Sequence, residues 1–198
     1  MIINSSVRLI DFVISILMLV MLSPLLVTIG IAIRLTSRGP VLFTQLRYGM
    51  NKKKFTIFKF RTMTSTESNS EFKQATVNDA RVTRIGKFLR SSSIDELPQL
   101  ANVVLGHMSL VGPRPHPISL DDHFSKSIPD YDLRYTVRPG LTGLAQIRGL
   151  RGPTPKTKDM AQRITADVEF VEGYSLRGYW KILIITPLII FLKRGRGT

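Results

Sequence analysis

Two adjacent carboxylates, Asp95 and Glu96, are the residues of this chain best suited to carry out chemistry. They lie in the segment SSSIDELPQL (91–100), within a sequence that has 28 Lys and Arg residues against 14 Asp and Glu. One carboxylate of such a pair can attack as a nucleophile while the other holds a hard cation such as Mg²⁺. We therefore predict that Asp95 and Glu96 are catalytic.

The same segment also has two purely structural interpretations. Ser93 followed by Glu96 spells a capping box ahead of an apolar helix. Alternatively, Pro98 is tolerated only among the first residues of a helix, which would make Asp95 the N-cap. The free N–H groups of that helix would then favour both carboxylates. An N-cap aspartate is a common structural feature, so this position alone does not establish catalysis.

Several cations could neutralise a phosphorylated substrate beside these carboxylates. Lys59 and Arg61 are two residues apart on a predicted strand, so both should point from the same face. Arg114 lies in VGPRPHP (111–117), where alternating prolines keep the backbone extended and lower the entropic cost of orienting the guanidinium. The glycine-rich segment RPGLTGLAQIRG (138–149) could bring backbone N–H groups close to a phosphate. A solvated edge strand and a rigid surface turn are the structural alternatives for the first two features.

Around these residues the sequence predicts an α+β fold that is mostly helical. Residues 41–47 and 54–63 are rich in β-branched and aromatic side chains and flank a Gly-Met-Asn-Lys turn, which predicts a small β-hairpin. Apolar stripes predict helices over 79–90 and 160–174. The first of these helices also has a cationic stripe, so it could lie on anionic lipid headgroups as an interfacial amphipathic helix. The predicted divisions are a membrane helix-break-helix (1–38), a catalytic domain (39–180) and a C-terminal interfacial apolar segment with a basic tail (181–198).

The N-terminal apolar segment from Phe12 to Ile33 has 22 residues without a charge. As a straight helix it would reach roughly 33 Å, just enough for a hydrocarbon layer of about 30 Å. Ser23 and Pro24 lie at its centre, where the missing N–H of proline predicts a bend. The two arms would reach only ~18 and ~14 Å, which fits a hairpin that dips into one leaflet. A kinked helix that spans the bilayer fits almost equally well.

The charges that flank this segment indicate its orientation. Eight basic residues follow the apolar run before the first acidic residue, Glu67, which places this side in the cytoplasm by the positive-inside rule. Near the other end of the chain, residues 182–192 are apolar, contain Pro187 and are too short to span a bilayer. An interfacial helix with a basic anchor is the favoured interpretation of that segment, and a buried core helix is the alternative.

Composition restricts the classes of function. The net charge of +14 points to an anionic partner: nucleic acid, an acidic membrane face or a phosphorylated substrate. Nucleic acid is not expected, because aromatic residues do not alternate with the basic runs and no helix-turn-helix or zinc pattern is present. The chain has no cysteine, which excludes disulfide frameworks and thiolate zinc sites. Its histidines, His107, His116 and His123, lack the spacing of metal ligands, and we interpret them as incidental.

Taken in order, these segments resemble the bacterial sugar transferase family, specifically its small monotopic phosphoglycosyl transferases. The resemblance extends over nearly the whole chain. It rests on the Ser23-Pro24 pair and on four motifs, KFRTM (59–63), RVTRIGKFLR (81–90), SIDELPQLANVVLGHMSLVGPRP (93–115) and RPGLTGLAQIRG (138–149). The tail (149–176) is similar to the branch of the family that transfers hexose 1-phosphates to a polyprenyl phosphate, although it has Pro153 and Tyr174 where that branch usually has Glu and Trp.

The resemblance implies a re-entrant membrane helix bent at Ser23 and Pro24, with a catalytic domain on the cytoplasmic face of the bacterial inner membrane. It implies transfer of a sugar 1-phosphate from a UDP-sugar to undecaprenyl phosphate, with release of UMP. Asp95 would form a covalent aspartyl-phosphosugar, and Glu96 would bind Mg²⁺. Because a carboxylate attacks an anionic phosphoryl group only where cations neutralise it, the candidate substrate-binding residues are Lys59, Arg61, Arg90, Arg114 and Arg138.

The sequence therefore predicts a Mg²⁺-dependent, membrane-embedded phosphoglycosyl transferase in the first membrane step of surface polysaccharide or glycoconjugate synthesis. The rival hypothesis is a basic membrane-surface scaffold without enzymatic activity, which recruits anionic lipids or other glycan enzymes. The sequence does not decide which UDP-sugar is used, whether the chain forms a homo-oligomer or which cations meet the donor and which the acceptor.

Overall fold

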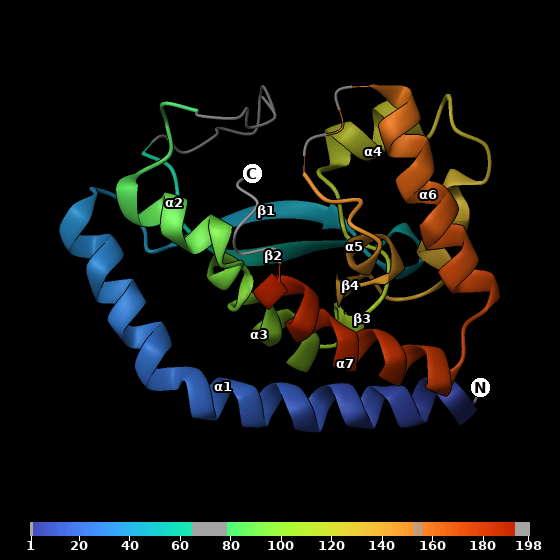
Figure 1. Ribbon diagram of the computed structural model, residues 1–198, viewed down its shortest axis with the longest axis horizontal. Coiled ribbons are helices and arrows are strands. Elements are labelled where there is room, and N and C mark those ends of the chain that lie inside the picture. Colours follow the sequence, from blue (N-terminus) through green and yellow to red (C-terminus); the bar gives the residue numbers. More distant parts are fainter. Residues whose placement is uncertain (1, 65–78, 153, 155, 193–198) are drawn as a thin grey trace.

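The computed structural model describes residues 2–64, 79–152, 154 and 156–192. This part of the chain is mostly helical and has two small two-stranded sheets, as the sequence predicted. Figure 1 shows a long bent helix, α1, around one side of a domain that contains the remaining elements. The main core lies between α1 (Ile2–Thr36), the hairpin, α3 (Gln99–Val104), β3 (Ser109–Val111) and α7 (Leu176–Leu192).

Helix α1 (Ile2–Thr36) is continuous through Pro24, so the expected interruption is a bend within one helix. Figure 1 shows this bend in the C-terminal half of α1. Pro24 has no N–H to donate to the carbonyl of Val20, and the hydroxyl of Ser23 donates to that carbonyl instead, at 2.8 Å. The Ser-Pro pair therefore bends the helix without leaving the freed carbonyl unpaired. The segment Ser5–Thr36 is long and apolar enough to cross a membrane.

The N-terminal arm of α1 is bonded to the rest of the domain by two charged side chains. Arg8 donates from Nη2 to the carbonyl of Val104 at 2.6 Å. Asp11 is 1% exposed and accepts from the backbone N–H of Leu110 at 2.8 Å and from the hydroxyl of Tyr179 at 2.6 Å. A buried carboxylate costs free energy unless it is hydrogen-bonded. These contacts therefore fix this arm to the domain rather than leaving it surrounded by lipid.

The C-terminal arm of α1 packs against a different part of the same domain. Ile29 and Ile33 are buried in one cluster with Phe60 and Leu89. Both arms thus contact the domain through the inner side of the bend. Other apolar side chains along α1 are exposed, namely Leu9, Phe12, Val13, Leu17, Val20, Met21, Leu25, Val27, Ile31 and Leu35.

The predicted β-hairpin is confirmed. Strand β1 (Leu42–Tyr48) pairs antiparallel with β2 (Lys54–Phe60), and the short helix η1 (Met50–Lys52) closes the turn. Residues 51 and 52 both have φ of 56°, a left-handed conformation that asparagine tolerates better than most residues. The hairpin presents the side chain of Lys59 from β2 toward the turn that follows α2.

Helix α2 (Arg84–Ser91) is shorter than the helix predicted from residue 79. The hydroxyl of Thr83 accepts from the N–H of Gly86 at 2.9 Å and caps the helix, which fixes its start. Val82 instead forms an isolated β-bridge with Met63. A Cβ at Gly86 would lie 2.1 Å from the carbonyl oxygen of Thr62, so the glycine permits α2 to pack directly on the backbone after β2.

The rest of the domain combines several short elements with two longer helices near the C-terminal end of the described residues. The parallel strands β3 and β4 pair with each other. Helix α6 confirms the helix predicted over 160–174. In chain order these elements are η2 (Ile94–Glu96), α3 (Gln99–Val104), β3 (Ser109–Val111), α4 (Ile118–Phe124), η3 (Tyr131–Thr136), β4 (Gly140–Thr142), α5 (Leu144–Ile147), α6 (Thr157–Glu172) and α7 (Leu176–Leu192).

Helix α7 combines both interpretations of the C-terminal apolar segment. It begins at Leu176, so it runs through the boundary placed at residue 180. Tyr179 and Ile182 are buried in the main core, whereas Ile184 and Leu188 are 64% and 60% exposed. The first half of α7 is thus a core helix, and the second half offers apolar surface. The predicted basic tail, residues 193–198, lies outside the described residues.

Candidate active site

Asp95 and Glu96 lie in the tight turn η2 between α2 and α3. The residue before this turn, Ser93, has the left-handed φ of 58° and makes no capping hydrogen bond with its side chain. The N-cap of α3 is Pro98. Both structural interpretations of the segment, the capping box and the Asp95 N-cap, are therefore wrong. The backbone N–H of Glu96 already donates to the carbonyl of Ser93 at 3.3 Å within the turn, so it is not a free helix N-terminal donor.

Glu96 is neutralised by two of the predicted cations. Lys59 donates to its Oε1 at 2.9 Å, and Arg114 donates with both Nη atoms, one of them to Oε2 at 2.9 Å. Burial alone would raise the pKa of Glu96, but the charges of Arg114 and Lys59 hold it below its ordinary value. Burial lowers the pKa of Lys59, whereas the charge of Glu96 raises it. Glu96 is thus an ionised carboxylate at any physiological pH.

Asp95 has a contrasting environment. Its side chain is buried, and no hydrogen bond or ion pair within the described part of the chain involves its carboxylate. Burial and then the neighbouring charge of Glu96 raise the pKa of Asp95 to about 6, although Lys59, Arg114 and Arg90 act in the opposite direction. This carboxylate is therefore more basic than an ordinary aspartate.

Arg90 and Arg61 lie on the side of the turn that faces α1. Arg90, at the end of α2, donates from Nε to the hydroxyl of Thr62 at 2.8 Å, and its charge is near enough to lower the pKa of Asp95. Arg61 donates from Nη2 to the carbonyl and hydroxyl of Ser37, both at 2.8 Å, just after α1. Arg90 therefore belongs to the surroundings of Asp95, whereas Arg61 is bonded to the residue that follows α1.

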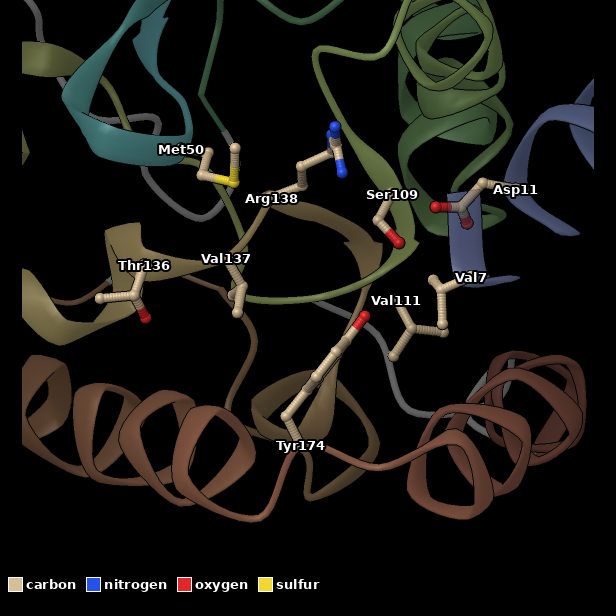
Figure 2. A pocket seen from close by; sticks show the side chains of 9 residues that line it. All are labelled: Val7, Asp11, Met50, Ser109, Val111, Thr136, Val137, Arg138 and Tyr174. Atoms are coloured by element: carbon tan, nitrogen blue, oxygen red, sulfur yellow. The ribbon is translucent and has the colours of Figure 1, made fainter. Parts of the chain in front are cut away.

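Arg138 is at the other end of α3. It donates from Nε to the carbonyl of Gly106 at 3.1 Å, where a cation suits the negative end of the helix dipole. Figure 2 shows its side chain in a cavity lined also by Asp11, Ser109 and Tyr174, and neither Asp95 nor Glu96 lines this cavity. The structure thus brings Lys59 and Arg114 onto the carboxylate pair but does not bring Arg138 to it.

Arg151 is a nearby cation that the sequence analysis did not select. Burial and the charge of Arg114 lower its pKa, while the charge of Glu96 acts in the opposite direction, so Arg151 lies within electrostatic reach of both. The glycine-rich segment just before it was the available signal in the sequence. The structure pairs Arg148 with Glu169 at 2.5 and 2.6 Å on the exposed surface.

His116 was interpreted as incidental, and this is wrong. Its ring is 4% exposed and lies 2.7 Å from Nη1 of Arg134 at Nδ1. Burial and the charge of Arg134 lower the pKa of His116 to about 3, so the ring is neutral. Because arginine has only donors, Nδ1 of His116 must be the acceptor of this hydrogen bond. The spacing of the histidines could not predict the contact of His116 with Arg134, because this contact depends on packing between segments that are distant in the chain.

The carboxylate pair fits a magnesium ion. Mg²⁺ commonly takes one or two protein carboxylates and completes its shell with water and substrate phosphates. Oε2 of Glu96 accepts one hydrogen bond, from Arg114, and so retains a lone pair. Among the described residues, no group of three or more His, Cys, Asp or Glu side chains is arranged to hold a metal ion. A magnesium ion held by Glu96 would therefore complete its shell with water or substrate phosphates.

Comparison with known proteins places this arrangement in a family. The sequence profile of bacterial sugar transferases matches residues 3–193, from α1 to the end of α7. The chain belongs to the bacterial sugar transferase family. The matched region includes α1, the carboxylate pair and the segment that carries Arg114.

Three relatives illustrate how the family members differ in length. A "UDP-glucose:undecaprenyl-phosphate glucose-1-phosphate transferase" of Klebsiella pneumoniae is 47% identical over 95% of this chain and 40% of the relative. A protein of the same description from Caulobacter vibrioides is 50% identical over 90% of this chain and 67% of the relative. The "Exopolysaccharide production protein PSS" of Rhizobium leguminosarum is 43% identical over 96% of both chains. This sugar transferase thus spans two fifths of the Klebsiella relative and nearly all of the Rhizobium one.

Proposed function

We propose that this sugar transferase moves a sugar 1-phosphate from a UDP-sugar to undecaprenyl phosphate, giving undecaprenyl-diphosphate-sugar and UMP. The observation that carries the proposal is the difference in environment between the two carboxylates of the pair. Glu96 is neutralised by Lys59 and Arg114, whereas Asp95 is buried, basic and without a partner among the described residues. The names of the Klebsiella and Caulobacter relatives support the same donor class and acceptor.

In the first half of the reaction, an oxygen of Asp95 attacks the phosphorus that carries the sugar. A new P–O bond forms to the carboxylate, the bond between the two phosphates breaks, and UMP leaves with the electron pair. In the second half, a phosphate oxygen of undecaprenyl phosphate attacks the same phosphorus and displaces Asp95, which is regenerated as a carboxylate. Two successive displacements at one centre let a small site serve a soluble donor and a lipid acceptor in turn.

The cations near the pair supply the charge that this reaction needs. The donor diphosphate and the attacking carboxylate are both anionic, so their approach requires compensating positive charge. Arg114 is held in a bidentate contact with Glu96, and Arg151 and Arg90 lie within electrostatic reach of the pair. Glu96 would hold Mg²⁺, which when bound would neutralise phosphate charge and stabilise the leaving group.

The packing of α1 supports a re-entrant arrangement in the membrane. Arg8 and Asp11 bond the N-terminal arm to the domain, and Ile33 packs the C-terminal arm on the same domain. A helix with both arms on one water-soluble domain has both ends on one side of the bilayer. The exposed apolar side chains of α1 would then face lipid in one leaflet, with the domain on the cytoplasmic side of the bacterial inner membrane.

The decisive experiment replaces the proposed nucleophile. Asp95→Asn removes the attacking charge and keeps the side-chain volume, so we expect at least a ~1,000-fold loss of UMP release from a UDP-sugar supplied without acceptor. UMP release across a panel of UDP-sugars is the measurement, and mass spectrometry should find an added hexose phosphate on Asp95 of the parental chain.

Asp132→Asn is the matched control, because Asp132 is an exposed carboxylate paired with Lys52 at 2.6 Å. It should release UMP at the parental rate. An active Asp95→Asn variant would refute the nucleophile assignment. A parental chain that releases no UMP from any UDP-sugar, yet binds anionic vesicles regardless of Asp95, would favour the scaffold hypothesis.

A further inference from the structure

A second group of charged side chains lies directly behind Arg114, in the interior of the domain. It joins α4, η3 and α6 with the proline-flanked segment that carries Arg114. Its titratable side chains are between 1% and 6% exposed. They are His116, Asp121, Tyr131, Arg134, Arg163 and Asp167.

Arg134 is at the centre of this buried group. Its Nη1 donates to Oδ1 of Asp121 at 3.1 Å, and its Nη2 lies 3.0 Å from Oδ2 of Asp167. Tyr131 also donates to Oδ1 of Asp121, at 2.6 Å. Two carboxylates thus face two guanidinium groups, Arg134 and Arg163, around the neutral ring of His116. The group balances its own charge, so it is not a site that attracts a further anion.

Two of its hydrogen bonds lead out to the segments beside the carboxylate pair. Arg134 donates from Nη2 to the backbone carbonyl of Arg114. Arg163 donates from Nη2 to the carbonyl of Gly152 at 3.0 Å, the residue after Arg151. The buried group therefore contacts the backbone of Arg114 itself and of Gly152, the residue after Arg151. Arg114 and Arg151 are the two arginines near Glu96 on this side of the domain.

The segment around Arg114 depends on such support because prolines flank it. Pro113 and Pro115 have no N–H to donate, so the segment cannot be held by a regular ladder of backbone hydrogen bonds. The carbonyl of Pro113 accepts from the N–H of Gly140 at 2.8 Å. The next carbonyl, that of Arg114, accepts from the side chain of Arg134. A small rotation here would break the two-pronged contact between Arg114 and Glu96.

We propose that Arg134 is a positioning residue for the transfer reaction, acting through the backbone of Arg114, and that Asp121 and Asp167 hold Arg134 in place. This inference rests on the proposed function for its kinetic test. A guanidinium can serve two carboxylates and a carbonyl simultaneously because its five N–H donors are fixed in one plane. A lysine at the same position would keep the charge but would lose this geometry.

The test is a double-mutant cycle in the full chain in detergent or nanodiscs. Arg134→Lys should lower kcat for UMP release about tenfold in the parental background and less than about twofold in an Arg114→Lys background. We expect Arg134→Lys to have little effect in the Arg114→Lys background because Arg134 acts only through Arg114. Equal losses in both backgrounds would overturn the proposal, since a general weakening of the fold does not depend on Arg114.

Arg148→Lys is the matched control, because Arg148 is also an arginine paired with a carboxylate but lies on the exposed surface. It should leave kcat unchanged in both backgrounds. Should Arg134→Lys fail to fold, Asp167→Asn replaces it in the same cycle. This variant keeps the side-chain volume and removes one of the two carboxylates that hold Arg134, and the same two outcomes support or overturn the proposal.

Hydrogen exchange separates this inference from the proposed function. Arg134→Lys should increase the amide exchange of the peptide covering residues 111–117, whereas Arg148→Lys should not. This readout needs no activity, so it applies even if the parental chain releases no UMP and the transferase proposal fails. Unchanged exchange in 111–117 would overturn the positioning role independently of the kinetics.

Discussion

The two buried charged groups of this protein differ in how completely their members are paired. In the group around Arg134, each carboxylate and guanidinium contacts at least one partner, although Oδ2 of Asp121 and the Nε atoms of Arg134 and Arg163 have no hydrogen bond within the part of the chain that the structure describes. In the group at η2, Glu96 is paired with Lys59 and Arg114, but Asp95 has no hydrogen bond among the described residues. Charged side chains in mutual contact stabilise one arrangement of the backbone, whereas a buried carboxylate without a partner destabilises the fold.

The largest effect on stability should come from removing a charge from the group around Arg134. Asp121→Ala would leave Arg134 and Arg163 with Asp167 as the one remaining carboxylate of the group, so one buried positive charge would be uncompensated and we expect a loss of about 3–5 kcal/mol in the free energy of unfolding. Denaturant unfolding of the full chain in detergent, followed by circular dichroism, is the measurement. A loss below about 1 kcal/mol would mean that the two buried groups do not differ in the way described.

Removing the charge of Asp95 should instead increase the free energy of unfolding. The folded state raises its pKa to about 6 from 3.8, so the stability that the protonated form provides is present below pH ~4 and is lost as the pH rises through about 6. Asparagine does not ionise, so the Asp95→Asn variant does not lose this stability as the pH rises. We expect the variant to be more stable than the parental chain by up to ~3 kcal/mol at pH 7 to 8, and by almost nothing at pH 4. Unfolding measured at both pH values checks the sign, and a destabilised variant at pH 8 would contradict it.

The smallest effect is expected at an exposed pair, which sets the baseline for the comparison. Glu169 and Arg148 form a close ion pair, but both side chains are about half exposed. Glu169→Gln should therefore change the melting temperature by less than about 2 °C at physiological salt. Thermal unfolding by circular dichroism gives this number. A shift as large as that of Asp121→Ala would show that charge removal is damaging everywhere in this basic protein.

Much of the fold follows from local sequence patterns. The hairpin was predictable from β-branched strands around a turn, and α6 from its apolar stripe, because both depend on residues close together in the chain. The start of α2 was not predictable from the stripe. It is set by the Thr83 cap and by the contact of Gly86 with Thr62, which lies more than twenty residues earlier.

The carboxylate pair was also predictable, because two adjacent acids are conspicuous in a basic chain. The cations that contact the pair were harder to predict. Lys59 and Arg114 were among five plausible cations, and the sequence offered no means of telling them from Arg138, whose partner is a carbonyl at the far end of α3. The group around Arg134 was missed altogether, because Asp121 and Asp167 become neighbours only when α4 and α6 pack together.

The attachment of Asp11 has a consequence for how this protein can exist in solution. Asp11 belongs to α1, yet it is the acceptor for the N–H of Leu110 and the hydroxyl of Tyr179 inside the domain. Cutting the chain after residue 38 would strip both donors of their acceptor and open the core at Val7. Helix α1 is therefore an internal structural member of the domain, and its removal should prevent the remaining residues from folding by themselves.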